Sequence, residues 1–103
     1  MSVRAHPIKK INYGREIFNL WHDEYFRNLL DRKGILDQLN IDGYGILEIS
    51  KYDLDEIEND IEADVRENSD INPEEVKRAK EIINDIRKEM RKRKDDYLSF
   101  YCF

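Results

Sequence analysis

The feature that most constrains the fold is a long amphipathic segment, residues 72–94, NPEEVKRAKEIINDIRKEMRKRK. Asn72 suits the N-cap, Pro73 suits the first helical position, and Glu75 stands where a capping box needs an acidic side chain. Apolar residues then recur every three or four positions and predict one buried stripe, formed by Val76, Ala79, Ile82, Ile83, Ile86 and Met90. Other parts of the chain must cover this stripe.

The length of the chain, 103 residues, predicts a single small domain, residues 1–103, with one modest core. Charged residues make up 40% of the chain, but hydrophobic residues also make up 40% and aromatic residues 11%. This composition is too apolar for a disordered chain. Pro7 disfavours a helix at the start, so residues 1–7 are expected to form a flexible arm, and a short edge strand near residues 8–13 is compatible with the pattern.

A first helix is expected over residues 15–33, between Gly14 and Gly34. One stripe along it contains Ile17, Trp21, Tyr25 and Leu29, and three further residues widen this stripe: Phe18, Phe26 and Leu30. We interpret it as a core helix. Because a chain this short has little to cover so wide an apolar face, the alternative is that part of it binds a partner. The candidate interaction residues here are Phe18, Trp21 and Phe26.

The middle of the chain predicts a tight turn at residues 40–45, a short strand at residues 46–49 and a helix over residues 51–67. Ser50 is the expected N-cap of this helix, with Asp53 as its capping-box partner. Its apolar stripe consists of Leu54, Ile57, Ile61 and Val65.

At the C-terminus, residues 97–103 alternate between two faces and are rich in aromatic side chains, which predicts a second strand. Pairing it with residues 45–50 gives a strand–helix–helix–strand unit. We therefore expect an α+β fold, with a small antiparallel sheet of two or three strands packed with about three helices. The second face of this sheet would be covered by the first helix or by another copy of the chain.

Charge separates strongly along the chain. The outer face of the helix over residues 51–67 is acidic, with Asp53, Asp55, Glu56, Glu58, Asp60, Glu62 and Asp64, whereas residues 87–94 are mostly basic. Helices joined by a short loop usually pack antiparallel, so these two faces could neutralise one another. Otherwise they could bind charged partners. The candidate charged interaction residues are Asp55, Glu58, Glu62, Arg87, Arg91 and Arg93.

No motif predicts a catalytic, metal or cofactor site. His22 lies beside Asp23 and Glu24 but lacks a second histidine at helical spacing, and the turn at residues 40–45 lacks the carboxylate that closes a calcium loop. Cys102 is flanked by aromatic residues and predicts a small buried hydrophobe. A single cysteine, the lack of a long apolar run and the lack of a signal sequence predict a cytoplasmic protein without membrane association.

The sequence therefore predicts a non-catalytic protein-interaction or regulatory module, with a protein partner or self-association into a homo-oligomer. The alternative is an acidic mimic of nucleic acid, or a regulator associated with it, that uses the charged faces of residues 50–75 and 87–94. The net charge of −5 disfavours direct binding of nucleic acid. A small enzyme using His22 and Glu24 is the third interpretation, and any pair of carboxylates could be nominated for it equally well.

Overall fold

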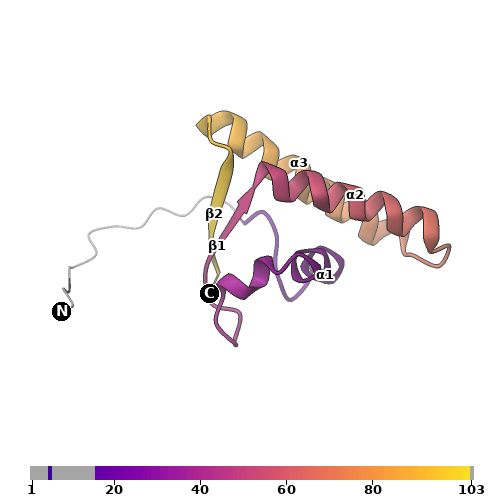
Figure 1. Ribbon diagram of the computed structural model, residues 1–103, viewed down its shortest axis with the longest axis horizontal. Helices are drawn as coiled ribbons and strands as arrows, with labels where there is room; N and C mark the ends of the chain where they lie inside the picture. Colours follow the sequence, from indigo (N-terminus) through magenta and orange to yellow (C-terminus); the bar gives the residue numbers. More distant parts are fainter. Residues whose placement is uncertain (1–4, 6–15, 103) are drawn as a thin grey trace.

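The computed structural model describes residue 5 and residues 16–102. Figure 1 shows the elements in chain order: α1 (Glu24–Arg32), the short 3-10 helix η1 (Ile35–Gln38), β1 (Gly45–Ser50), α2 (Lys51–Glu67), α3 (Pro73–Arg93) and β2 (Tyr97–Cys102). The α+β class and the strand–helix–helix–strand unit are confirmed. The expected arm, residues 1–7, and the strand near residues 8–13 lie outside the described residues, apart from Ala5.

The sheet contains two antiparallel strands, β1 and β2, in a register that pairs Gly45 with Cys102 and Ser50 with Tyr97. Side chains alternate between its faces, so Leu47, Ile49 and Leu98 are buried while their neighbours along each strand face outward. This is the pairing that the alternation in the sequence predicts. In Figure 1 the sheet stands at one end of the α2–α3 hairpin, and the loop joining the two helices lies at the other end.

The free edge of β1 is occupied by a side chain. The Gln38 amide nitrogen donates to the Glu48 carbonyl at 2.9 Å, and the Gln38 amide oxygen accepts from the Glu48 N–H at 3.1 Å. The same nitrogen also donates to the Ile35 carbonyl at 3.0 Å, which ties the side chain to η1. The amide of Gln38 thus makes the pair of hydrogen bonds that a neighbouring strand would make at this point.

Both long helices begin where the sequence predicts. Ser50 caps α2 in a reciprocal capping box, in which the Asp53 N–H donates to Ser50 Oγ at 3.1 Å and the Ser50 N–H donates to Asp53 Oδ2 at 2.9 Å. Asn72 caps α3 by accepting from the Glu74 N–H at 2.9 Å, which replaces the expected pairing with Glu75. The cap at Asn72 is confirmed, but its capping box is not formed.

The core gathers the apolar stripe of α3, the inner face of the sheet and one side of each of α1 and α2. All six predicted stripe residues of α3 are buried, as are Leu54, Ile57 and Ile61 of α2. Val65 was expected on the same stripe but is exposed. It lies in the last turn of α2, one residue past Asp64, to which the Tyr25 and Arg32 side chains of α1 bind.

The first helix is shorter than the sequence predicts. It begins at Glu24, and residues 16–23 precede it as a loop. The predicted end is confirmed, because Gly34 follows the last turn with a φ of 71°, in the left-handed region that favours glycine. Within the part of the chain that the structure describes, no helix combines the length and apolarity needed to cross a membrane.

Candidate interaction surface

The loop before α1 is held by the side chains of Asn19 and Asp23, which compete with helical hydrogen bonds. The Asn19 N–H donates to Asp23 Oδ2 at 2.7 Å, and Asn19 Oδ1 accepts from the Trp21 N–H at 2.8 Å. The Asn19 carbonyl accepts from the N–H groups of His22 and Asp23. Asn and Asp favour such local bonds over helix interiors, which explains why the predicted helix does not extend through this segment.

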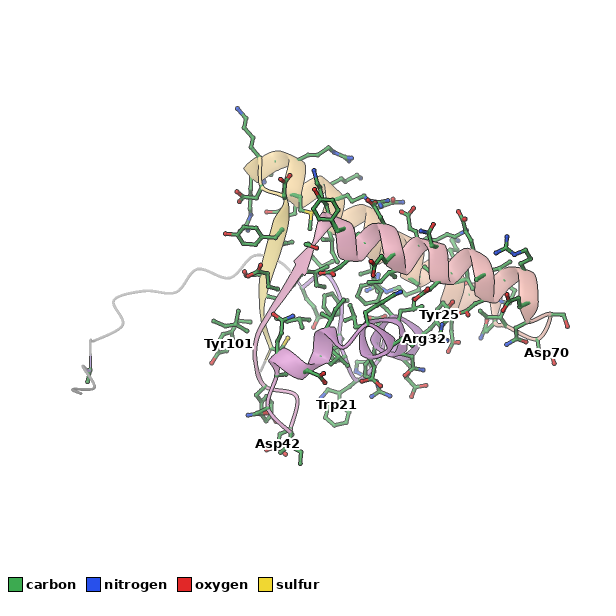
Figure 2. The ribbon with its side chains drawn as sticks, in the orientation of Figure 1. Trp21, Tyr25, Arg32, Asp42, Asp70 and Tyr101 are labelled. Carbon is green, nitrogen blue, oxygen red and sulfur yellow. The ribbon has the colours of Figure 1, made fainter. Side chains whose placement is uncertain are left out.

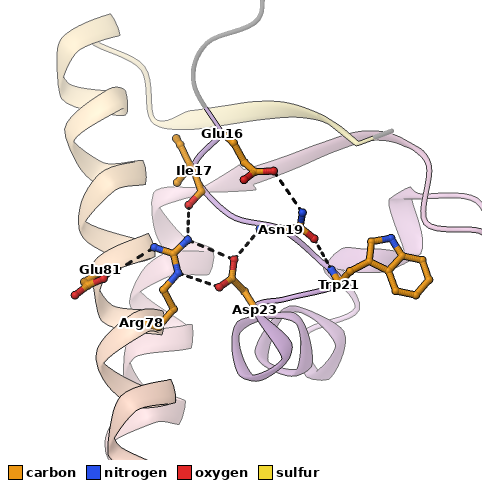
Figure 3. A network of polar contacts seen from close by, with 7 residues as sticks. All are labelled: Glu16, Ile17, Asn19, Trp21, Asp23, Arg78 and Glu81. Atoms are coloured by element: carbon orange, nitrogen blue, oxygen red, sulfur yellow. Dashed lines mark hydrogen bonds and ion pairs between the residues drawn. The ribbon is translucent and has the colours of Figure 1, made fainter.

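Arg78 of α3 fastens this loop to the hairpin (Figure 3). Its Nε donates to Asp23 Oδ1 at 2.9 Å, while one terminal nitrogen donates to Asp23 Oδ2 at 3.4 Å and to the Ile17 carbonyl at 3.0 Å. Burial by itself would raise the pKa of Asp23, but the hydrogen bonds from Arg78 and Asn19 outweigh it and hold this pKa below its ordinary value. Asp23 is therefore a charged anchor for the loop.

Trp21 points away from this anchor. Figure 3 shows its indole directed outward from the Asp23–Arg78 cluster, and 75% of the residue is exposed. It was predicted on the apolar stripe of a core helix, and that prediction is wrong, because the loop turns its side chain outward. As a candidate interaction residue, Trp21 is well exposed.

Beside Trp21 lies a hollow of about 240 Å³, which we call the Trp21 hollow. Its lining comes from the loop, α1, η1 and the turn that follows, and consists of Leu20, Trp21, Arg27, Leu36, Leu39, Asn40, Ile41, Asp42 and Gly43. Leu20, Leu36 and Leu39 pack against the core, whereas Ile41 is fully exposed. Figure 2 places Trp21 and Asp42 at the same end of the molecule, on the side away from the α2–α3 hairpin.

The predicted turn at residues 40–45 is confirmed and shapes one wall of the hollow. Asn40 Oδ1 accepts from the N–H groups of Asp42 at 3.0 Å and Tyr44 at 2.9 Å, and the Asn40 N–H donates to the Tyr44 carbonyl at 3.0 Å. Gly43 adopts a φ of 83°, which a glycine accommodates without strain. Ile41 therefore projects from a tightly bonded turn.

Phe18 and Phe26, the other two aromatic candidates, belong to the interior. Phe26 is only 1% exposed, and Phe18 stacks edge-to-face on Phe26 at 5.1 Å and on Phe100 of β2 at 5.0 Å. A partner could not contact Phe26 directly, so this candidate is withdrawn. Phe18 is partly buried and serves to attach the loop to the sheet.

Two of the three acidic candidates of α2, Asp55 and Glu58, lie beside a cation of the same chain. Arg87 of α3 donates to Asp55 at 2.9 Å and also pairs with Glu58. Arg32, the last residue of α1, pairs with Asp64 at 2.8 Å, and Lys33, which caps this helix, lies 3.3 Å from Asp60 and 3.7 Å from Glu56. Glu62 is exposed and makes no ion pair among the described residues. The complementarity expected between the two helices is therefore present, and α1 adds to it.

The basic candidates also differ in whether they form ion pairs with other residues of the chain. Arg87 is half-buried between two carboxylates, while Arg93 pairs with Glu89 one turn earlier at 2.9 Å. Arg91 is exposed and has no ion-pair partner in the described part of the chain. The structure brings together Asp55, Glu58 and Arg87, and it leaves Glu62 and Arg91 apart from that group.

Among the groups with altered pKa values, Tyr25 has a hydrogen-bond partner, whereas the pKa of Cys102 is shifted by burial alone. Burial and a 2.7 Å hydrogen bond to Asp64 raise the pKa of Tyr25, so its hydroxyl stays protonated and donates. Cys102 is half-buried, and burial raises the pKa of its thiol.

His22 is exposed and lines a second hollow of about 150 Å³, where the start of α1 meets the start of α3. Among residues 5 and 16–102, no group of three or more His, Cys, Asp or Glu side chains could hold a metal ion.

Reasoning from sequence missed most of this surface. The Asn19–Asp23 spacing was a signal for the loop, because both residue types form local backbone bonds. Two features depend on tertiary packing and left no local pattern in the sequence: the contacts of Arg78 with Asp23, and the shared lining of the hollow by Leu20, Leu36 and Leu39.

Comparison of the chain with protein-family models, with curated proteins and with solved structures gave no match.

Proposed function

We propose that this chain is a non-catalytic protein-interaction module that binds a protein partner through the Trp21 hollow. The observation that carries the proposal is the exposure of Trp21 and Ile41, which both line a mostly apolar hollow. Large apolar side chains gathered at one site are typical of interaction surfaces, and tryptophan is enriched among residues that dominate binding energy. The Arg78–Asp23 anchor supports it further, since it holds the loop in place before binding.

The experiment that tests this proposal is affinity capture from source-cell lysate at low and high salt, with and without nuclease. The bait is the wild-type chain, Trp21→Ser, Ile41→Ser, or Tyr52→Ser as the matched control. Tyr52 is 68% exposed and does not line the hollow. A partner of the hollow should bind wild type and the control at high salt and be lost from the other two variants. Capture that Trp21→Ser and Ile41→Ser leave unchanged would refute the proposal.

A second readout uses the single tryptophan of the chain. Because Trp21 is exposed, its emission should shift to shorter wavelength when a purified partner covers it. A partner that binds without moving this emission does not occupy the hollow. The fluorescence measurement therefore separates binding at this site from capture through any other surface.

We propose self-association through a different surface, the outward face of the sheet, as a second candidate interaction. The outward face of the sheet exposes Ile46 of β1 and Tyr97 of β2, and a two-stranded sheet gains stability when further structure covers it. Light scattering over a range of protein concentrations tests this, with Ile46→Ser as the variant and Ile41→Ser as its control. A dimer that forms through the sheet should weaken in Ile46→Ser only, and a monomer at all concentrations would contradict it.

The charged faces support an acidic mimic of nucleic acid less well. Such a mimic needs carboxylates that are opposed by nothing within the chain, whereas Asp55, Glu58 and Asp64 each bind an arginine of a neighbouring helix. Each of these pairs reduces the negative potential that a basic partner would meet. A partner that is lost at high salt but still binds the Trp21→Ser variant would indicate that the charged faces, and not the Trp21 hollow, form the binding surface.

A further inference from the structure

The half-buried arginine of the Trp21 hollow differs from the others. In the part of the chain that the structure describes, three basic residues are half-buried: Arg27, Arg78 and Arg87. Arg78 binds Asp23, and Arg87 binds Asp55 and Glu58. Arg27 has no ion pair among the described residues, although it lines the hollow together with Asp42. A guanidinium favours a carboxylate partner, and that of Arg27 has none among the residues that the structure describes.

The other polar groups around the hollow are mostly donors. Asn40 uses its side-chain oxygen for the backbone of Asp42 and Tyr44, so its amide nitrogen is the group left for a ligand. The indole N–H of Trp21 is a donor as well and makes no hydrogen bond within residues 16–102. Asp42 is the only acidic residue of the lining. The hollow therefore complements a ligand that carries acceptors and negative charge beside an apolar group.

The size of the hollow favours a single side chain over a whole small molecule. Pockets that enclose small molecules hold roughly 300–1,000 Å³. The volume here is about 240 Å³, which suits one side chain of the size of leucine or phenylalanine. A peptide segment can place such a side chain in the hollow and keep its backbone carbonyls outside, close to the donors of Asn40 and Trp21.

We infer that the Trp21 hollow recognises an acidic peptide segment, whose apolar side chain fills the hollow and whose neighbouring Asp or Glu binds Arg27. This inference rests on the proposed function and names the chemistry of the partner. The hydrophobic contact supplies most of the affinity, and the Arg27–carboxylate pair supplies the selectivity for acidic partners.

The test is a selection of short random peptides displayed on phage, performed on the wild-type chain and on Trp21→Ala. We expect wild type to enrich peptides with Leu, Phe or Trp within one helical turn of Asp or Glu, and Trp21→Ala to enrich none of them. Selected peptides are then synthesised with the acidic residue and with its amide counterpart, and their binding is measured from the emission of Trp21. The change to the amide should weaken binding to wild type about tenfold, as expected for loss of one charge-assisted hydrogen bond.

Variants of Arg27 complete the test. Arg27→Gln should weaken binding of the acidic peptide about tenfold and leave the amide peptide unchanged, while Arg27→Lys should retain part of the preference. Arg66→Gln is the matched control, since Arg66 is exposed and makes no ion pair within the described residues. Circular dichroism establishes that each variant is folded.

The outcomes separate the two proposals. Peptides that depend on Trp21 but carry no acidic residue, or that bind Arg27→Gln as tightly as wild type, would overturn the inference and leave the proposed function standing. Selection that gives no peptide dependent on Trp21 would overturn both. Octanoate that binds as tightly as the best peptide and shifts the Trp21 emission would show that the hollow takes a lipid-like carboxylate, and would also overturn the inference.

Discussion

The pair formed by Arg78 and Asp23 offers the sharpest test of how this surface is held. Asp23 is 11% exposed and Arg78 is 42% exposed at the side chain, and their closest contact is 2.9 Å. A pair on the open surface contributes about 0.2–1 kcal/mol, and breaking a fully buried pair costs about 3–5 kcal/mol. The geometry here lies between these limits. We expect a coupling free energy of about 1.5 kcal/mol, in the range measured for hydrogen bonds to charged groups.

The experiment is a double-mutant cycle with Asp23→Ala, Arg78→Ala and the combined variant, each unfolded by urea. Far-UV circular dichroism is the suitable signal. Trp21 is already 75% exposed in the folded state, so its fluorescence should change little on unfolding. Asp23→Ala removes no helix cap, since the Asp23 side chain makes no capping bond to α1. It does leave the Asn19 N–H without its acceptor, so it should cost about 2–2.5 kcal/mol, or roughly 1–1.5 M in urea midpoint.

The control is the pair of Arg93 and Glu89, which has the same Nε contact of 2.9 Å but side chains 52% and 32% exposed. Because both partners are solvated and lie one helical turn apart, their coupling should be about 0.3–0.5 kcal/mol. A coupling between Asp23 and Arg78 no larger than that of the control would refute our reasoning. It would mean that the loop carrying Trp21 is held by apolar contacts, such as those of Phe18, and not by the ion pair.

Three further predictions follow from the described contacts. Asp23 and Asp64 both have lowered pKa values in the folded state, so their contribution to stability is complete above the ordinary aspartate pKa of about 4 and is lost as pH falls below it. The free energy of unfolding of Asp64→Asn, measured over a series of acidic pH values, should therefore fall less steeply than that of wild type. An identical dependence on pH in the two proteins would contradict this. Ser50→Ala should lower the free energy of unfolding by about 1 kcal/mol because it removes the cap of α2, whereas Ser69→Ala, in the exposed loop after that helix, should change it by less than about 0.5 kcal/mol. Gln38→Ala should cost about 1–2 kcal/mol by urea unfolding, because two hydrogen bonds to Glu48 and one to Ile35 are lost; a variant as stable as wild type would show that water replaces the amide without cost.

The elements that the sequence predicts well are those whose signals are local. The cap at Ser50, the stripe of α3 and the alternation of residues 97–102 each combine a periodic pattern with a clear start or end, and each is present in the structure. The prediction of the first helix was wrong in its N-terminal part. It gave more weight to the apolar spacing around Trp21 than to the tendency of Asn19 and Asp23 to form turns. The Trp21 hollow could not be predicted, because Leu20, Leu36 and Leu39 share no periodicity and meet only after the chain has folded.

The amide of Gln38 has a consequence for how copies of this chain can assemble. Its two hydrogen bonds satisfy the backbone N–H and carbonyl of Glu48, which lie in the middle of the outward edge of β1. A strand from another copy could pair with the backbone of Glu48 only by displacing the Gln38 side chain. One polar side chain thus protects the middle of this strand edge against strand addition.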